Sequence, residues 1–167
     1  FTYGQAFYED LLKDDDIIQD VKTTFIDKSG NSYVPYNYNG EFNGEVTVRT
    51  ALASSLNVPA VKVLDMIGVE DMIACVKRAG VKTLSEPNRD DLRVTLGGGE
   101  GTLFDLTNAY NSLARDGKFI DTYSVEFIKN PEDEVVYKKS ISEPSKVWFD
   151  KSHYVSQLVT SILSDQS

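Results

Sequence analysis

Apolar residues recur every three or four positions in several segments of the chain, and this spacing predicts amphipathic helices. Residues that cap or end helices mark the boundaries, such as Thr47 before the second segment and Gly68 and Gly80 after the next two. The predicted helices cover residues 2–13, 48–56, 59–67, 70–79, 103–116 and a last segment that starts near residue 152.

Other segments carry strand-forming residues beside turn residues. Residues 21–25 favour a strand, and residues 27–31 form a turn after it. Residues 122–129 and 134–138 flank an Asn-Pro-Glu-Asp sequence, which predicts a β-hairpin. Helices and strands in these proportions predict an α+β fold that is mainly helical.

Residues 33–44 are rich in Tyr, Asn, Gly and Pro and follow no regular period. Linkers seldom contain so many large rings, so we expect an ordered loop held by aromatic packing. With 167 residues, of which 41% are apolar, the chain fits a single globular domain over residues 1–167.

The net charge of −9 argues against a nucleic-acid partner, because such binding requires a positive patch. No apolar run approaches the length that crosses a membrane. The acidic residues between positions 9 and 16 are predicted to be a solvated helix end and loop, since no glycine-containing calcium loop surrounds them.

The chain has one cysteine and one histidine. Cys75 falls in a helical apolar pattern and is predicted to be a core residue. His153 lies near a helix start with no paired ligand in the sequence, so we expect neither a Ser-His-Asp site nor a metal site built on it. No cofactor is predicted.

A glycine-rich stretch at residues 97–101 suggests phosphate binding at first sight. It has neither the spacing of a dinucleotide-binding loop nor the Gly-Lys-Ser/Thr of a P-loop, and Glu100 would repel phosphate. A tight turn before a helix capped by Thr102 is the better interpretation. The apolar residues predicted on one face of that helix are Leu103, Leu106, Ala109, Tyr110 and Leu113.

The tripeptide Ser55-Leu56-Asn57 carries side chains that could take part in catalysis or binding. Its helical register predicts Ser55 on the inward face, and Pro59 then starts a second helix, so a hydroxyl and a carboxamide meet at a helix junction. In one interpretation the serine relays a proton and the amide binds a peptide. In the other, Ser55 bonds back to its own helix and Asn57 caps the next one. A second Ser-x-Asn, at residues 29–31, is predicted to be a plain turn.

Residues 46–61 closely resemble the Ser-x-Asn segment of bifunctional (class A) penicillin-binding proteins. Residues 33–44 look like the loop that precedes this segment in the family, and residues 96–110 look like its later glycine turn and helix. Residues 1–7 are similar to the segment that comes directly after the family's Ser-x-x-Lys-Pro motif. The resemblance runs through the chain in family order, so it is far more specific than one tripeptide.

This resemblance implies the helical part of the β-lactamase/transpeptidase-like fold, with a small hairpin. It implies serine acyl transfer on D-alanyl-D-alanine stem peptides of peptidoglycan, blocked by β-lactams. Ser55 would pass protons between a lysine and the leaving group, and Asn57 would bind the substrate amide. The parent protein would lie outside the membrane, carry a membrane anchor and have a glycosyltransferase domain upstream.

The chain departs from the family pattern in two ways. It contains no Ser-x-x-Lys, and its Lys28-Ser29-Gly30 stands before Ser55, whereas the family's Lys-Thr-Gly follows the Ser-x-Asn motif. We therefore expect residues 1–167 to be part of a transpeptidase domain that is inactive alone. The alternatives are a D,D-carboxypeptidase, a β-lactamase, a β-lactam sensor, or a helical binding module in which Ser55 and Asn57 lie apart from any cleft.

Overall fold

The computed structural model describes residues 1–26, 30–82, 84, 91–140, 146–147 and 152–165. The helical elements are α1 (Thr2–Tyr8), α2 (Val48–Ala53), α3 (Asn57–Ile67), α4 (Val69–Arg78), the 3-10 helix η1 (Leu92–Leu96), α5 (Leu103–Leu113) and α6 (Ser152–Leu163). The strands are β1 (Ile17–Asp20), β2 (Phe25–Ile26), β3 (Ser32–Tyr33), β4 (Gly44–Thr47), β5 (Lys118–Phe119), β6 (Phe127–Lys129), β7 (Val135–Lys138) and β8 (Lys146–Val147).

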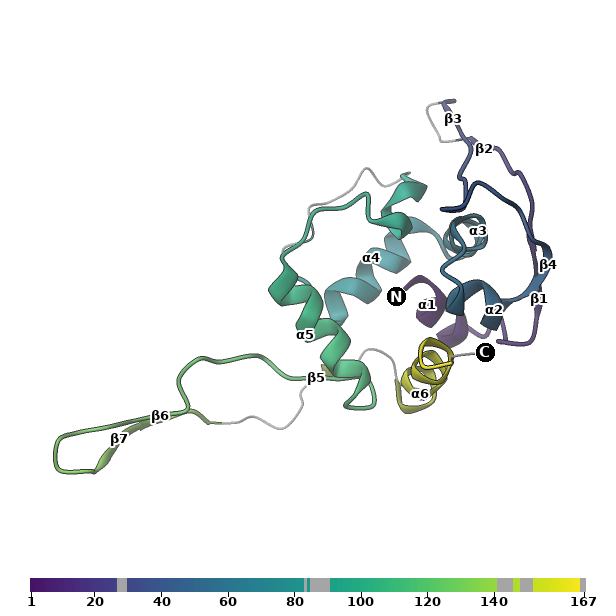
Figure 1. Cartoon of the computed structure of the whole chain (residues 1–167). Helices are drawn as coiled ribbons and strands as arrows, with labels where there is room; N and C mark the ends of the chain where they lie inside the picture. Colours follow the sequence, from purple (N-terminus) through teal and green to yellow (C-terminus); the bar gives the residue numbers. More distant parts are fainter. Residues whose placement is uncertain (27–29, 83, 85–90, 141–145, 148–151, 166–167) are drawn as a thin grey trace.

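Helix α1 lies at the centre of the helical body, with α2, α3, α4 and α6 around it (Figure 1). Its residues from Thr2 to Phe7 are all buried, which is typical of a helix covered on every side. Leu64 of α3 and Ile162 of α6 are fully buried in the same core. Cys75 of α4 is also buried there, as the sequence predicted.

The predicted helix over residues 2–13 is wrong at its C-terminal end, since α1 stops at Tyr8. Asp10 adopts a left-handed conformation with φ of 56°, and the N–H of Leu11 then bonds to the carbonyl of Ala6 at 3.0 Å. This turn closes the helix in the way that glycine usually does. Asp occupies the position here, so the stop signal was not evident in the sequence.

The strands pair in four antiparallel two-stranded sheets among the described residues. In the sheet that matters for the site, β1 pairs with β4 so that Asp20 lies opposite Gly44. The predicted strand at residues 21–25 is largely wrong, because β1 ends before it and β2 contains only its last residue. Alternation along β1 buries Ile18 and Asp20 on one face.

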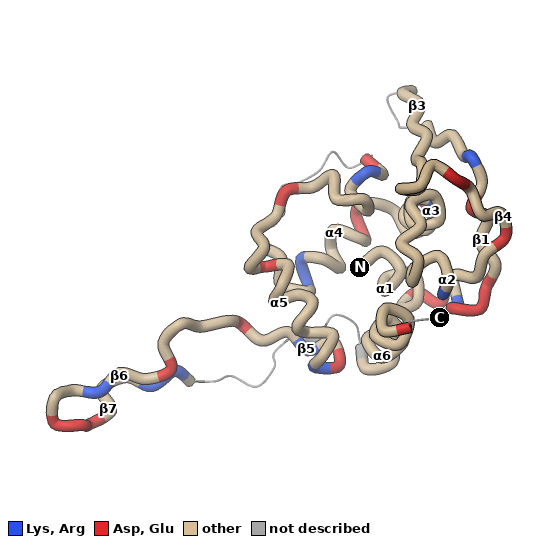
Figure 2. The backbone as a smooth tube through the Cα atoms, in the orientation of Figure 1, with Lys and Arg blue, Asp and Glu red and all other residues tan. Residues whose placement is uncertain are grey.

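The hairpin predicted between residues 122 and 138 is confirmed as β6 and β7, which extend away from the helical body (Figure 1). Every residue of these two strands is exposed. Asp and Glu are spread over the β1–β4 edge, the α5 region and the hairpin tip rather than collected on one face (Figure 2).

Candidate functional site

The Ser-x-Asn tripeptide occupies the turn between α2 and α3. Helix α2 begins at the predicted cap, where the Thr47 hydroxyl accepts a hydrogen bond from the N–H of Thr50 at 3.1 Å. It ends in a Schellman turn: the N–H of Ser55 bonds to the carbonyl of Leu52, and the N–H of Leu56 bonds to that of Ala51. The turn requires a left-handed residue, and Ser55 fills this position with φ of 54°.

Ser55 is exposed, so the predicted inward placement is wrong. The helical register that would have buried it ends at Ala53, and Ser55 adopts the left-handed conformation instead. A non-glycine residue in the left-handed region costs about 1 kcal/mol, and such residues are concentrated at functional sites. Among the described residues, no group hydrogen-bonds to the Ser55 hydroxyl.

Asn57 is the first residue of α3, and its side chain does not cap the helix. The carboxamide Nδ2 donates instead to the carbonyl oxygen of Tyr36 at 2.8 Å. The cap comes from another segment: Oδ1 of Asn37 accepts from the N–H of Asn57 at 2.8 Å and from that of Val58 at 3.4 Å. The Asn57 side chain is therefore relieved of the capping role.

These contacts differ from those that the structural interpretation of the tripeptide predicted. A purely structural role needed Ser55 to bond to its own helix and Asn57 to cap the next one. Neither contact is present among the described residues, and both side chains line one open groove of about 830 Å³. The binding-module alternative, which placed them apart from any cleft, is contradicted on this point.

The opposite side of the groove is formed by η1, the glycine turn and α5. Thr95 and Leu96 of η1 line it together with Gly97, Gly99 and Gly101. Leu103, Leu106 and Tyr110 of α5 complete it. The predicted apolar face of this helix is therefore divided, because Ala109 is buried in the core and Leu113 packs against it. The groove thus presents Ser55 and Asn57 on its α2–α3 wall and large apolar side chains on its α5 wall.

The glycine turn does what the sequence predicted. Gly97 closes η1 in a left-handed conformation with φ of 94°, and Thr102 caps α5 by accepting from the N–H of Asp105 at 3.1 Å. A β-carbon on Gly98 would lie 2.9 Å from the carbonyl oxygen of Arg93, so this position excludes side chains.

Sequence reasoning missed Asp20 and Asn37, which stand behind the tripeptide. Asp20 is fully buried, and both its oxygens accept hydrogen bonds from Asn37 Nδ2, at 3.0 and 2.8 Å. Burial, and then the charge of Asp20, raise the pKa of Tyr3 well above its usual value. The strand alternation that buries Ile18 also buries Asp20, and this was the available signal.

The other candidates lie elsewhere. His153 is exposed and pairs with Asp116 at 3.1 Å, and it does not line the groove. Burial raises the pKa of the Cys75 thiol, so the thiolate is disfavoured. Lys28 and Ser29, of both the Lys-Ser-Gly and the second Ser-x-Asn tripeptides, lie outside the described residues.

Metal-binding clusters and membrane-spanning helices are both absent from the described residues. No group of three or more His, Cys, Asp or Glu side chains is arranged to hold a metal ion in this part of the chain. Within the same residues, no helix combines the length and the apolar character needed to span a membrane.

Comparison with known sequences shows that the chain is similar to penicillin-binding proteins. No family model matches it. Penicillin-binding protein 1A of Rickettsia felis is 36% identical over 112 residues, which cover 67% of this chain and 14% of that protein. Penicillin-binding protein 1C of Escherichia coli is 35% identical over 120 residues, which cover 71% of this chain and 15% of that protein.

Solved structures agree with this result. The D,D-transpeptidase domain of a peptidoglycan glycosyltransferase from Eggerthella lenta has a TM-score of 0.75 at 18% identity, covering 97% of this chain and 45% of that chain. PonA1 from Mycobacterium tuberculosis, in complex with penicillin V, has a TM-score of 0.74 at 16% identity, covering 96% and 44%. At these identities the similarity defines the fold.

The fold is therefore that of penicillin-binding transpeptidase domains, which confirms the α+β prediction. The chain belongs to the class A penicillin-binding proteins, as its sequence resemblance indicated. It spans 14–15% of the length of these two curated relatives.

Proposed function

We propose that this chain forms the Ser-x-Asn wall of a peptidoglycan D,D-transpeptidase site, with Ser55 relaying protons and Asn57 binding the substrate amide. The observation that carries this proposal is the release of both side chains from local structural roles at one groove. An asparagine whose capping role is taken by another residue is poorly explained by helix stability alone, and the turn at Ser55 places this serine at the same groove.

The reaction in this proposal is acyl transfer. A serine Oγ bonds to the carbonyl carbon of D-alanyl-D-alanine, the peptide C–N bond breaks, and the leaving amine takes a proton. The hydroxyl of Ser55 can accept a proton on one lone pair while donating its own, which suits a relay to that amine. A second amine or water then releases the acyl group.

The chain has no Ser-x-x-Lys, so the nucleophile and its lysine would come from outside these 167 residues. Without a nucleophile no acyl bond forms, so the chain by itself is expected to be inactive. Residues 1–167 would be one part of a transpeptidase domain.

The carboxamide of Asn57 suits a peptide group. With Nδ2 already donating to Tyr36, it still offers a second N–H and the carbonyl Oδ1, which match the acceptor and donor of an amide. Stem peptides and the acylamino group of penicillins both present such an amide. The penicillin V complex of the similar PonA1 supports β-lactam binding in this family.

The relatives are bacterial penicillin-binding proteins, which are cell-envelope enzymes. The proposal therefore places the working protein outside the membrane, attached by an anchor and joined to a glycosyltransferase domain, with stem peptides as its partner.

Labelling with a fluorescent penicillin tests the proposal. The chain alone should remain unlabelled, and a protein that joins it to a Ser-x-x-Lys segment in family order should be labelled covalently. In that protein Ser55→Ala should slow labelling about 100-fold, since an acid–base group contributes about 100-fold or more.

Ser54→Ala is the matched control, because Ser54 is the adjacent exposed serine and does not line the groove. Its labelling rate should stay at the wild-type value. Labelling of the chain alone, or equal rates for the two variants, would contradict the proposal. Products formed with and without an amine acceptor distinguish a transpeptidase from a carboxypeptidase.

A further inference from the structure

The buried carboxylate of Asp20 is bonded on all sides by amides. Besides Asn37, its Oδ2 accepts from the backbone N–H of Asn43 at 2.9 Å and from Nδ2 of Asn43 at 2.7 Å. A fully buried acid is costly unless it is satisfied in this way. Packing of the β1–β4 sheet does not explain why a carboxylate, rather than an apolar side chain, is buried at position 20 beside the loop of residues 33–44.

Asn37 links this carboxylate to the site. Its Nδ2 donates to both oxygens of Asp20 and to the carbonyl of Glu41 at 2.8 Å, and its Oδ1 faces the first turn of α3. The carboxylate accepts hydrogen bonds only, so it allows one orientation of the Asn37 amide. With the amide reversed, oxygen would face oxygen and the NH₂ group would face the helix N–H groups.

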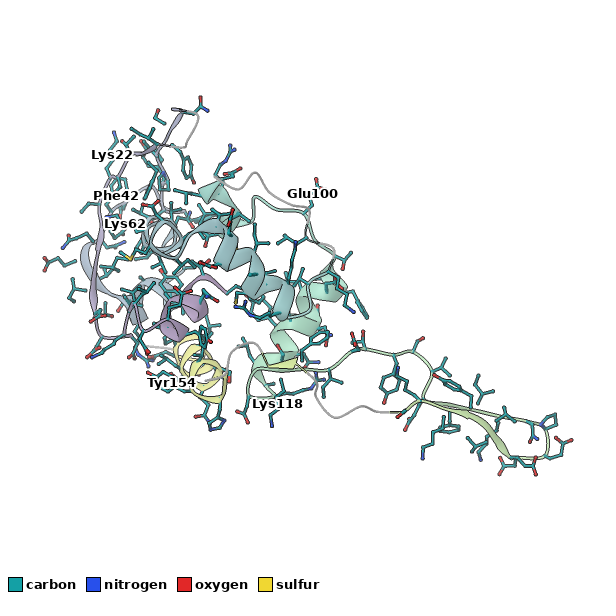
Figure 3. All side chains as sticks on the ribbon, turned by 180° about the vertical axis from the view of Figure 1, so that it is seen from behind. Lys22, Phe42, Lys62, Glu100, Lys118 and Tyr154 are labelled. Carbon is teal, nitrogen blue, oxygen red and sulfur yellow. The ribbon has the colours of Figure 1, made fainter. Side chains whose placement is uncertain are left out.

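Two adjacent loop residues then hold Asn57 at two points. Asn37 holds its backbone N–H and Tyr36 holds its side-chain Nδ2, both at 2.8 Å. The N-cap residue of α3 is Leu56, which has no side-chain acceptor, so the loop supplies the only side-chain cap described for this helix. The loop meets α3 on the side of the molecule where Figure 3 labels Phe42 and Lys62.

We propose that Asp20 is a positioning residue for amide recognition: it fixes the Asn37 amide, and Asn37 with Tyr36 sets the orientation of the Asn57 carboxamide in the groove. This inference rests on the proposed function, because it assigns Asp20 a role in the same acyl-transfer site. Asp20 touches no substrate. It acts through the Asn37 side-chain amide, which accepts from the backbone N–H of Asn57, the residue that carries the ligand-binding carboxamide.

Asp20→Asn tests the role with almost no change in shape. The new amide accepts at one position only and tolerates the reversed Asn37, so the Asn57 carboxamide loses its fixed orientation. Misplacement of a binding group costs about 10- to 100-fold in rate. We expect acylation by benzylpenicillin to slow about tenfold in a protein that carries this chain with a Ser-x-x-Lys segment.

A carbapenem provides the readout that a purely structural role would not change. It acylates the same serine but lacks the acylamino group that the Asn57 carboxamide would bind. Acylation by the carbapenem should therefore slow less than about threefold in Asp20→Asn. Equal slowing with both β-lactams, or no slowing with either, would overturn the proposal.

Two further variants test whether the effect of Asp20 reaches the substrate through Asn37 and Asn57. In an Asn57→Ala background, Asp20→Asn should have no further effect on the penicillin rate, since the positioned group is gone. Asn43→Ala removes one bond to the same carboxylate without touching Asn37, and it should stay near the wild-type rate. An Asp20 effect that persists without Asn57, or an equal effect from Asn43→Ala, contradicts the positioning role.

Each penicillin acylation rate is divided by the concentration of sites that react with the carbapenem. A variant that is partly unfolded is then not mistaken for one that acylates slowly. If Asp20→Asn leaves no reactive sites, Asn37→Ser replaces it and should give the same selective loss with penicillin. The two proposals fail differently. A wild-type protein that no β-lactam labels refutes the proposed function, whereas labelling that depends on Asn57 but not on Asp20 refutes only this inference.

Discussion

The two walls of the groove are built in different ways. On the α2–α3 wall, Asn57 is held at two points by the loop, and the buried Asp20 supports that loop from behind. On the α5 wall, Leu103 and Tyr110 are 79% and 53% exposed. The first wall has the fixed polar groups that recognition needs. The second offers apolar area with few constraints on its side chains.

The buried face of α5 explains this contrast. It consists of the small or polar residues Asn108, Ala109 and Ser112, and Asn108 Nδ2 donates to the carbonyl of Ile120 at 3.2 Å. Small residues let the helix approach β5 closely, while its large apolar residues remain at the groove. An amphipathic pattern therefore identifies a helix, but it does not say which apolar face enters the core.

Gly80 is the position where a substitution should most disturb the packing beneath the α5 wall, because it follows α4 and lies against Phe119 of β5, which packs on α5. Gly80 has φ of 94°, and a β-carbon there would lie 1.9 Å from the ring of the buried Phe119 in β5. Gly80→Ala should lower the free energy of unfolding by about 3 kcal/mol, because overpacking adds to backbone strain. Urea unfolding measures this change.

Gly40→Ala is the control for Gly80, since Gly40 also has a positive φ of 76° but has no atom near a β-carbon. It should cost about 1 kcal/mol. Equal losses for the two variants would mean that contact with Phe119 does not determine the effect.

The α2–α3 wall should be sensitive to Asn37. Asn37→Ala removes the donor to Oδ1 of the buried Asp20 and the acceptor for the first N–H of α3, so we expect a loss of about 2 kcal/mol in unfolding free energy. The measurement is again urea unfolding. Asn39→Ala serves for comparison, because Asn39 is an exposed residue of the same loop, and its removal should cost less than about 0.5 kcal/mol. A small effect at Asn37 would show that the amide network contributes little.

The smallest stability effect is expected on the exposed face of α5. Leu103→Gln should change the unfolding free energy by less than about 0.5 kcal/mol, since the side chain is already in water. Leu64→Ala, at a fully buried leucine of α3, should cost about 3 kcal/mol by the same measurement. A large loss at Leu103 would indicate that the α5 wall is packed after all.

Local signals in the sequence predicted much of this structure. The caps at Thr47 and Thr102, and the glycine stops at Gly68 and Gly80, depend on contacts within a few residues, so they can be recognised without the fold. The resemblance in residues 46–61 identified the family for the same reason, because one continuous segment carries the Ser-x-Asn motif.

The parts that the sequence did not predict depend on distant contacts or on unusual backbone. The bonds from Asn37 to Asp20 and Asn57 join residues 17 and 20 positions apart, and no local pattern marks them. Among the described residues, the aromatic packing expected for the loop is limited to one ring pair, Tyr36 and Phe42, whose ring centroids lie 5.9 Å apart. Tyr38 is fully exposed. Ser55 fits an inward helical position, and only its left-handed turn places it at the groove.

Ser55→Gly tests most directly whether Ser55 is retained for chemistry rather than for stability. Glycine suits the left-handed turn, so the unfolding free energy should rise by about 0.5–1 kcal/mol, while penicillin acylation of a protein carrying this chain with a Ser-x-x-Lys segment should fall about 100-fold. Greater stability with lost acylation is the predicted result. A variant that acylates at the wild-type rate would contradict the central claim that the Ser55 hydroxyl belongs to the reaction.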